Sequence, residues 1–449
     1  MNQNFNKIVE KIKQHRTFPT ASAVFPDLGL LEMVHDPAKN KTGFVLYRDA
    51  QWSFESEITL SPYRRLVPYS PDNNLIKNEV VLFPSHPEEY SSDEQLVWLV
   101  QRFIHRYVDV SPLYEKIASY YVLLSWVYDG FNELPYLRLR GDPGSGKTRF
   151  LLTVGSLCYK PMFASGASSV SPLFRIIDAF RGTLIIDEGD FRMSDEKAEI
   201  VKILNNGNAR GFPVLRSEVT PQREFNPTAY AVFGPKLVAT RGFFQDRALE
   251  SRCITEEMGQ QHLRGDVPIS LTSAYKQEAL AIRNKLLLFR FRNLDKRGPA
   301  ESLVDRTIEP RLNQVFVPLL SIIDDERARQ DLRELARRIS RELLEDRGMD
   351  MDTQILEIIR DMAAGGKARL SVKDITDAFI KLHGSDYERT ITTKWVGTVI
   401  RKKLHLATQK SHGVFVIPPG EETKLARLYE KYGITAQVAN EPDAVEAAP

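Results

Sequence analysis

The segment from Gly141 to Thr148 has the residue types and the spacing of a phosphate-binding loop. It reads Gly-Asp-Pro-Gly-Ser-Gly-Lys-Thr and fits Gly-x-x-x-x-Gly-Lys-Ser/Thr, the Walker A pattern. Glycines let the loop turn tightly, so that backbone N–H groups converge on phosphate oxygens at the positive end of the following helix. We expect Lys147 to reach the β and γ phosphates of a nucleotide and the Thr148 hydroxyl to hold Mg²⁺. The predicted phosphate-binding residues are Gly141, Asp142, Pro143, Gly144, Ser145, Gly146, Lys147 and Thr148.

A second stretch, Thr183-Leu-Ile-Ile-Asp-Glu188, has the Walker B pattern of an apolar, β-prone run that ends in two acids. Asp187 would help to hold Mg²⁺. Glu188 would polarise the water that attacks the γ phosphate, because hydrolysis needs a positioned base beside the metal. The alternative is a core strand whose end is acidic by chance. The order of the two stretches along the chain favours a nucleotide site.

Strands and helices must position these residues. A buried strand precedes Gly141, and the apolar run 150–152 begins a helix, which is the context that Walker A requires. Pro235-Lys-Leu-Val-Ala-Thr240 predicts a third buried strand, and the Thr240 side chain at its end could contact the γ phosphate or the attacking water. The arginine-rich stretch 246–254 follows, and its composition alone favours a solvated charged turn.

Length and composition limit the possible classes of protein. The 449 residues predict two or three domains, and 42% hydrophobic with 27% charged residues is ordinary for a globular protein. A net charge of +2 means that any nucleic-acid interface is local. Two cysteines exclude a disulfide framework and a cysteine-based zinc site. The chain begins without a signal pattern, and its most apolar stretch, 120–128, is too short to span a membrane, so we expect a cytoplasmic protein.

Periodicity suggests how the chain is divided. Short strands between Pro-rich turns predict an accessory domain, and helical patterns then precede and follow the two motifs. The expected fold is α/β: a P-loop core with a helical lid, a small mixed N-terminal domain and a C-terminal winged helix. The predicted divisions are the accessory domain 1–92, the core with its preceding helices 93–268, the lid 269–347, the winged helix-turn-helix 348–432 and a disordered tail 433–449.

Three amphipathic helices, 353–362, 371–382 and 392–404, precede a hairpin at 405–417, which is the order of a winged helix-turn-helix. In such a fold the third helix can lie in a DNA major groove while basic side chains hold phosphates. The alternative is a protein-binding winged helix with a solvated basic face. The candidate DNA-binding residues are Lys394, Arg401, Lys402, Lys403 and Lys410.

The order of these motifs resembles that of AAA+ ATPases over roughly residues 115–345. Within that class the chain resembles helicase-like ATPases of phages and mobile elements, including the cassette-chromosome helicases of staphylococci, which resemble minichromosome-maintenance helicases. The phrases that carry this resemblance are Pro135-Tyr-Leu-Arg-Leu-Arg-Gly, Leu204-Asn-Asn-Gly, Pro235-Lys-Leu-Val-Ala-Thr and Leu249-Glu-Ser-Arg. The chain departs from the family in having neither room for a primase domain nor zinc-binding cysteines.

The resemblance implies that the nucleotide is ATP and gives roles to further residues. Thr240 matches the sensor 1 position, where such helicases often have Asn. Arg252 matches the arginine finger, which reaches the nucleotide of a neighbouring subunit. Arg311 is a candidate for sensor 2, contacting nucleotide. The segment before the Thr240 strand matches a hairpin that points into a ring channel, where Arg216 and Arg223 would grip DNA. The alternative is a hairpin that only covers the core.

These inferences together predict a hexameric, ATP-driven motor on DNA, and specifically a replicative helicase of a mobile element. Two alternatives stay open. One is a helicase loader or remodelling ATPase that opens no duplex. The other is a nucleotide-switched DNA-binding protein in which hydrolysis only times release. A small-molecule kinase is disfavoured by the Asp187-Glu188 pair and by the basic C-terminal region.

Overall fold

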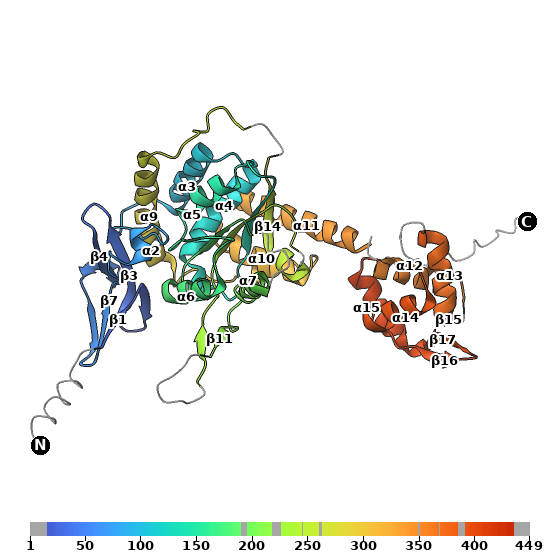
Figure 1. The fold of residues 1–449 in the computed structure, drawn as a ribbon. Helices are drawn as coiled ribbons and strands as arrows, with labels where there is room; N and C mark the ends of the chain where they lie inside the picture. The colour runs from blue at the N-terminus through green and yellow to red at the C-terminus, as the bar shows by residue number, and fades with distance from the viewer. Residues whose placement is uncertain are drawn as a thin grey trace, which may run out of the picture. The chain divides into compact units, whose positions relative to one another are not determined.

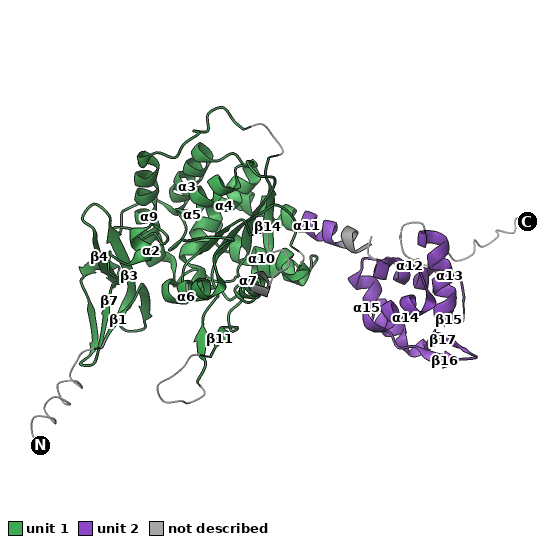
Figure 2. Cartoon of the chain, viewed as in Figure 1, with its two compact units in different colours: residues 1–336 green, residues 337–449 purple. Residues whose placement is uncertain are grey.

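The protein is described here by a computed structural model, in which the chain divides into two compact units, residues 1–336 and residues 337–449 (Figure 2). The described residues are 16–189, 195–217, 226–244, 246–259, 263–348, 351–367, 369–384 and 391–434. The predicted accessory region, the core and most of the predicted lid belong to the first unit. The basic C-terminal region belongs to the second.

The first unit contains a parallel sheet among its helices (Figure 1). The sheet has five strands in the order β14-β8-β13-β10-β9. In a parallel sheet the carboxyl ends of the strands meet at one edge, where ligands of α/β proteins bind. This sheet confirms the predicted α/β class and the strands expected before Gly141, at 183–187 and at 235–240. Its members are β8 (Tyr136–Arg140), β9 (Met162–Ser165), β10 (Leu184–Asp187), β13 (Lys236–Thr240) and β14 (Cys253–Glu257).

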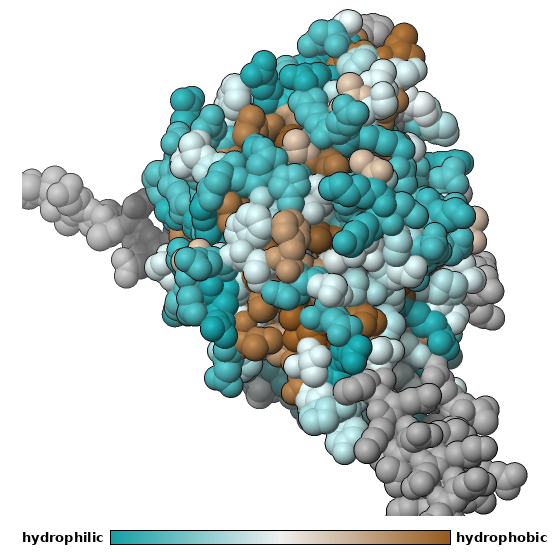
Figure 3. Space-filling model, turned by 90° about the vertical axis from the view of Figure 1, so that its left-hand side faces the viewer, coloured by the Kyte–Doolittle hydropathy of each residue, from teal (hydrophilic) through white to brown (hydrophobic). Residues whose placement is uncertain are grey.

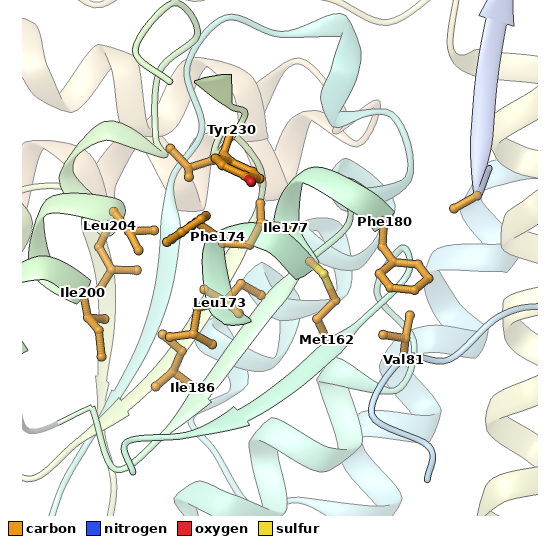
Figure 4. Packing of buried hydrophobic residues seen from close by; sticks show 14 of the residues in the cluster. Val81, Met162, Leu173, Phe174, Ile177, Phe180, Ile186, Ile200, Leu204 and Tyr230 are labelled. Carbon is orange, nitrogen blue, oxygen red and sulfur yellow. The ribbon is translucent and has the colours of Figure 1, made fainter. Parts of the chain in front are cut away.

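One face of the sheet packs against α6 (Val170–Phe180) and α7 (Asp195–Asn206). Because side chains alternate along a strand, Ile186 and Val238 point to this face together. They share a buried cluster with Phe174 and other apolar residues of the two helices (Figure 4). This cluster fixes α6 and α7 against the strands that carry the site.

The opposite face carries α5 (Lys147–Gly155), which contacts β10 and β13. A Cβ on Gly155 would lie 2.4 Å from Cδ1 of Ile185, so the helix approaches the sheet as closely as a glycine allows. Three longer helices pack around α5 and against one another: α3 (Asp93–Tyr107), α4 (Pro112–Trp126) and α9 (Ser273–Asn293). Helix α4 ends at Trp126, and the chain then turns into a short 3-10 helix at Tyr128–Gly130.

Two small sheets formed by residues 16–67 pack beside the parallel sheet. One is antiparallel with the order β2-β3-β4-β5, and the other has the order β1-β7-β6. Figure 3 shows apolar residues among polar ones on the face that this part of the chain presents. The bounds are β1 (Arg16–Pro19), β2 (Ser22–Phe25), β3 (Gly29–Asp36), β4 (Lys41–Arg48), β5 (Gln51–Glu55), β6 (Ile58–Ser61) and β7 (Arg64–Val67).

The N-terminal part is joined to the core through both backbone and charge. After α2 (Asn74–Lys77), residues 80–82 run along β9, where the Phe163 N–H donates to the Val80 carbonyl at 2.9 Å. A buried ion network lies nearby, in which Arg290 of α9 pairs with Glu32 of β3 at 2.7 Å. A charge left unpaired at such a buried site is strongly destabilising, so this network fixes α9 against β3.

The remaining elements of the first unit are a hairpin and several helices that lie outside the parallel sheet. The hairpin predicted before the Thr240 strand is present in its described parts, with its two strands antiparallel. The elements are β11 (Val214–Arg216), β12 (Thr228–Tyr230), α8 (Arg247–Glu250), the 3-10 helix η2 (Glu301–Leu303), α10 (Pro310–Leu320) and α11 (Glu326–Gly348), which continues into the second unit.

The second unit has a separate apolar core beneath three helices and a three-stranded antiparallel sheet, in the order β15-β17-β16. The three helices and the hairpin lie where the sequence predicted them; α15 was not predicted. The bounds are α12 (Met351–Ala364), β15 (Leu370–Ser371), α13 (Val372–His383), α14 (Thr393–Lys402), β16 (Gln409–Ser411), β17 (Val414–Ile417) and α15 (Glu422–Lys431).

Candidate nucleotide site and arginine cluster

A pocket of about 360 Å³ opens at the carboxyl edge of the parallel sheet. Three segments line it: the loop after β8, the end of β10 and the end of β13. Because β13 lies between β8 and β10, its end faces the gap between the other two segments. The lining residues are Pro143, Gly144, Gly146, Lys147, Thr148, Asp187, Glu188, Ala239, Thr240 and Arg241.

The loop after β8 needs glycine at both of its ends. Gly146 has φ +95° immediately before α5 begins at Lys147, in the left-handed region that favours glycine. A Cβ on Gly141 would lie 2.5 Å from the carbonyl oxygen of Met258. The Lys147 ammonium donates to the carbonyls of Gly141 and Asp142 at 2.6 and 2.7 Å, which keeps its charge at the mouth of the loop.

Thr148 and Asp187 are 39 residues apart in sequence and meet in the pocket. The Thr148 hydroxyl donates to Oδ2 of Asp187 at 2.6 Å. The other carboxylate oxygen, Oδ1, accepts the backbone N–H of Glu188 at 2.9 Å, which fixes the carboxylate. A hydroxyl and a carboxylate face to face are oxygen ligands of the kind that Mg²⁺ takes alongside phosphates. The residues present therefore fit the metal predicted for this site.

Glu188 extends from a constrained piece of backbone. Its φ is +55°, and a Cβ on Gly166 would lie only 2.1 Å from its carbonyl oxygen. The next N–H, that of Gly189, donates to the Ala239 carbonyl at 2.7 Å and ties the end of β10 to β13. The Glu188 carboxylate itself is 68% exposed and lies 3.8 Å from a guanidinium nitrogen of Arg241.

The Thr240 side chain is buried at the wall of the pocket, with 2% of the residue exposed. Within the described part of the chain its hydroxyl has no hydrogen-bond partner. A buried hydroxyl without a partner is unfavourable, so a native one needs an explanation. A ligand in the pocket that accepts or donates a hydrogen bond here would supply the missing partner.

Arg252 lies at the opposite edge of the sheet from the pocket. Its carbonyl accepts the N–H of Tyr136, the first residue of β8, whereas the phosphate loop follows Arg140, the last one. At about 3.3 Å per residue the strand separates these two points by about 13 Å. The Arg252 guanidinium is thus remote from the pocket of its own chain.

The Arg252 side chain is held by neutral oxygens. Nε donates to Oδ1 of Asn208 at 2.7 Å, and Nη1 donates to Oδ1 of Asn205 at 2.8 Å and to the Ala248 carbonyl. Burial, followed by the nearby charge of Arg311, lowers the pKa of Arg252, but a guanidinium remains a cation at neutral pH. Among the described residues it has no direct ion pair, so its positive charge remains available to an anion.

Arg311 is not among the residues that line the pocket. Its Nη1 donates to the Ser251 hydroxyl at 3.0 Å, immediately before Arg252. The structure thus places Arg311 beside Ser251 and outside the lining of the pocket in its own chain. The first turn of α10 instead places it in a cluster with Arg252, which we call the arginine cluster: Asn205, Asn208, Ser251, Arg252 and Arg311.

Of the two arginines predicted for the hairpin, the structure describes Arg216. Arg216 pairs with Glu199 of α7 at 2.8 Å and lies over the Phe174 ring at 5.0 Å, so it is held against the core. Arg223 lies outside the described residues. The described part of the hairpin exposes apolar side chains as well, with Leu215 61% exposed.

The basic residues of the second unit are on its surface. Lys394, Lys402 and Lys410 are exposed. Arg401 donates to the Thr408 hydroxyl at 3.3 Å and lies 5.7 Å from the centre of the Phe415 ring. Lys403 differs because its ammonium lies 3.6 Å from Asp352 of α12, an acid that the sequence pattern did not place beside it.

Three residues of the two sites escaped the sequence analysis: Arg241 in the pocket, and Asn205 and Asn208 in the arginine cluster. Arg241 had a usable signal, since it directly follows a polar residue at the carboxyl end of a buried strand. Asn205 belongs to the phrase Leu204-Asn-Asn-Gly, to which the resemblance gave no role, and Asn208 had no signal, because the role of both depends on how the end of α7 packs against α8.

Neither a metal site made by the protein alone nor a membrane-spanning helix is present among the described residues. They contain no group of three or more His, Cys, Asp or Glu side chains that could hold a metal by themselves. No helix among them is long and apolar enough to cross a membrane.

No protein-family model and no curated protein matches the chain. The fold is similar to that of the SCCmec type IV Cch active helicase, at 10% identity and a TM-score of 0.40, over 94% of this chain and 84% of that one. It is similar to the apo structure of the NrS-1 C-terminal region, at 12% identity and 0.36, over 86% and 96%. The full-length MCM homolog from Methanopyrus kandleri matches at 10% and 0.35, over 68% and 75%. These likenesses are remote, and the function proposed next rests on the residues of the pocket and of the arginine cluster.

Proposed function

We propose that this chain is an AAA+ ATPase that works as a ring-forming motor on DNA. The nucleotide site supports the first part of this proposal. Its glycine loop can hold phosphates at the start of α5, and Lys147 adds a positive charge there. Thr148 and Asp187 can hold Mg²⁺ between them and the phosphates. Glu188 supplies a carboxylate at the far side of the same pocket.

Each side chain has a distinct task in hydrolysis. Lys147 and the loop N–H groups bind and orient the β and γ phosphates. Bound Mg²⁺ would neutralise phosphate charge. Glu188 orients the attacking water and accepts its proton, while the buried Thr240 hydroxyl fixes the water or a γ-phosphate oxygen. The charge that develops on the phosphate in the transition state then needs an additional cation, which in related chemistry is an arginine finger.

The position of Arg252 is the observation that carries the proposal of a shared site. Its guanidinium is a cation without a direct ion pair among the described residues, yet the Arg252 backbone meets β8 at Tyr136, about 13 Å along the strand from the residue that leads into the phosphate loop of the same chain. A second copy could place its Arg252, with Arg311 beside it, against the first copy's pocket. Repetition of this head-to-tail contact closes a ring, and we propose a hexamer.

DNA contacts are proposed for two parts of the chain. The hairpin β11–β12 would face the channel of the ring, with Arg216 and Arg223 as candidate contacts. The second unit has the element order of a winged helix-turn-helix, and α14 with the β16–β17 wing would bind DNA phosphates through Lys394, Arg401, Lys402, Lys403 and Lys410. The sequence phrases shared with helicase-like ATPases support the more specific role of a replicative helicase of a mobile element.

The proposal is tested by measuring ATPase rate per subunit with and without single-stranded DNA, across a range of protein concentrations. We expect DNA to stimulate hydrolysis and the rate per subunit to rise with concentration, because the site is complete only between copies. A rate per subunit that stays constant down to concentrations where the protein is monomeric would exclude the shared site. Strand displacement of a labelled oligonucleotide then tests unwinding itself.

One observation favours the loader or remodelling ATPase as a second candidate. Within β11 and β12 the single cation, Arg216, is engaged with Glu199 and Phe174. A hairpin whose described part exposes apolar rather than basic side chains suits contact with a protein as well as with DNA. Hydrolysis of ATP without displacement of the labelled strand would favour this candidate. A nucleotide switch would show DNA binding that ATP prolongs, and hydrolysis that only releases the DNA.

A further inference from the structure

Arg241 lies in the nucleotide pocket, although no motif assigns it a role. It is the first residue after β13 and lines the pocket together with Lys147 and Glu188. Strand β13 stands between the strand that leads to the phosphate loop and the strand that ends in Asp187. The backbone of Arg241 therefore lies in the middle of the site, between the phosphate-binding loop and the carboxylates at the end of β10.

One partner of Arg241 in the structure is the proposed catalytic base. Its Nη2 lies 3.8 Å from Oε1 of Glu188, and the two side chains are 57% and 68% exposed. Both backbones are fixed, because β10 and β13 pair in register and the Gly189 N–H donates to the Ala239 carbonyl at 2.7 Å. The two side chains are thus held within reach of each other by the sheet.

This ion pair is of the kind that a phosphate can replace. A long pair between exposed side chains is weak, because water screens it. A phosphate group carries more negative charge than a carboxylate and accepts two parallel N–H bonds from a guanidinium. A γ phosphate in the pocket would compete successfully with Glu188 for Arg241.

We propose that Arg241 binds the γ phosphate of ATP bound to its own chain, and that this exchange frees the Glu188 carboxylate for the attacking water. The inference rests on the proposed ATPase function and deepens it. When ADP is bound, Arg241 stays paired with Glu188, and the pair keeps the carboxylate from taking its position beside the attacking water. Arg241 acts in the site of its own chain, in contrast to Arg252, which serves a neighbour.

Nucleotide affinity separates this role from a structural one. The Arg241→Ala variant and the wild type are titrated with a fluorescent non-hydrolysable ATP analogue and with fluorescent ADP. Loss of a charge-assisted hydrogen bond predicts about 10- to 100-fold weaker binding of the ATP analogue, with ADP affinity unchanged. Arg241→Lys should recover part of the loss, because a lysine keeps the charge without the fork. Equal affinity of wild type and Arg241→Ala for both nucleotides would overturn the inference.

Arg48 provides the matched control. It is also 57% exposed and also pairs with an exposed acid, Asp49 at 3.2 Å, but it lies in the N-terminal sheet. Arg48→Ala should bind both nucleotides like the wild type. An equal loss of analogue binding in Arg48→Ala and Arg241→Ala would mean a general charge effect and would count against the inference.

Mixed subunits distinguish this inference from the shared-site proposal. Lys147→Ala mixed with Arg252→Ala should regain ATPase activity, because one chain supplies an intact pocket and the other an intact Arg252. Lys147→Ala mixed with Arg241→Ala should stay inactive, since both defects lie in the pocket of the chain that carries them. Recovery in the second mixture would overturn the inference. If the mixture of Lys147→Ala with Arg252→Ala also stays inactive, the shared site is overturned. Selective loss of analogue binding in Arg241→Ala would still support the role of Arg241 in that case.

Discussion

Nε of Arg252 donates a hydrogen bond of 2.7 Å to the side-chain oxygen of Asn208, at the amino edge of the parallel sheet. An amide in this place orients the guanidinium and leaves its positive charge unpaired. A carboxylate in the same place would neutralise that charge. The arrangement suits a cation that must meet an anion from elsewhere. It also makes the geometry of that cation dependent on two asparagines that precede it by more than 40 residues.

Truncation of the Asn208 side chain should therefore slow ATP hydrolysis and leave nucleotide binding unchanged. We expect Asn208→Ala to lower kcat by about tenfold, the cost of one misplaced charge-assisted contact, with nucleotide affinity unchanged. Steady-state ATPase kinetics and nucleotide titration measure the two effects. Asn206→Ala, on the exposed side of the same helix end, is the control and should retain wild-type kinetics. A rise in KM with constant kcat in Asn208→Ala would contradict the positioning role.

Arg252 and Lys147 should fail in different ways. Lys147→Ala is expected to lose nucleotide binding, because the cation that contacts the phosphates is removed. Arg252→Ala should bind ATP like the wild type and lose turnover by three or more orders of magnitude, as arginine-finger variants do. Equilibrium binding and single-turnover hydrolysis distinguish the two steps. Undiminished hydrolysis by Arg252→Ala would remove the argument for a site between subunits.

Replacement of Thr240 by valine tests its unpartnered hydroxyl. The two side chains have nearly the same shape, and the hydroxyl makes no hydrogen bond within the described structure. Thr240→Val should thus be as stable as the wild type or more so, while kcat falls about tenfold or more through the loss of one polar contact in the transition state. Chemical denaturation and ATPase assays give the two readouts. A loss of stability with unchanged kcat would mean that the hydroxyl is structural.

The pH dependence of stability should report Lys236. Its buried ammonium donates to the carbonyls of Gly207, Val232 and Gly234 at 2.9–3.1 Å, and burial lowers its pKa to about 7. In the unfolded chain a lysine keeps its proton up to about pH 10.4, so between these values the unfolded state holds the extra proton. The free energy of unfolding should accordingly rise with pH in that window, by up to about 1.4 kcal/mol per unit, and be flat below it.

Urea denaturation of the wild type and of Lys236→Met at pH 6, 7, 8 and 9.5 isolates this contribution. The difference between the two free energies should change with pH only above about pH 7. A constant difference across the series would show that the lysine stays protonated in the folded chain. Lys402→Ala, at an exposed site, controls for general charge effects.

The two adjacent lysines at the end of α14 should contribute unequally to DNA binding. Both are exposed, but the Lys403 ammonium lies 3.6 Å from Asp352. Lys402→Ala should reduce the slope of log K against log salt by about 0.9, the value for one phosphate contact, and Lys403→Ala by less. Fluorescence anisotropy with duplex DNA at several salt concentrations measures both. Equal slopes for the two variants would place Lys403 in contact with phosphate despite its acid.

The sequence predicted those parts of the site that a local motif encodes. Thr148 and Asp187 were assigned from their motifs, and they meet at 2.6 Å. Strands such as β13 were predictable because a buried parallel strand is a continuous apolar run. Strand β14 was not, since Cys253-Ile-Thr-Glu-Glu has a single large aliphatic residue before its two acids and continues the arginine-rich stretch that was expected to be a charged turn. These acids are accommodated because Glu257 pairs with Arg140 on the neighbouring strand and Glu256 accepts from Ser111.

Other parts depend on which strands are neighbours, and no local pattern reports that. Arg241 belongs to the pocket because β13 stands between β8 and β10. The resemblance made Arg311 a candidate for sensor 2. Helix α10 places it beside Ser251, and it is not among the residues that line the pocket of its own chain. Arg241 and Arg311 can be read from the sequence, but the strand order that places them at opposite edges of the sheet cannot.

The short run of residues 80–82 along β9 has a practical consequence. Without it, β9 would be an outermost strand with unpaired N–H and C=O groups, which is a template for aggregation. A fragment that starts at residue 93 would lose this cover and would also expose Met162 and Phe180, which pack against N-terminal side chains. The N-terminal region thus protects the β9 edge of the parallel sheet.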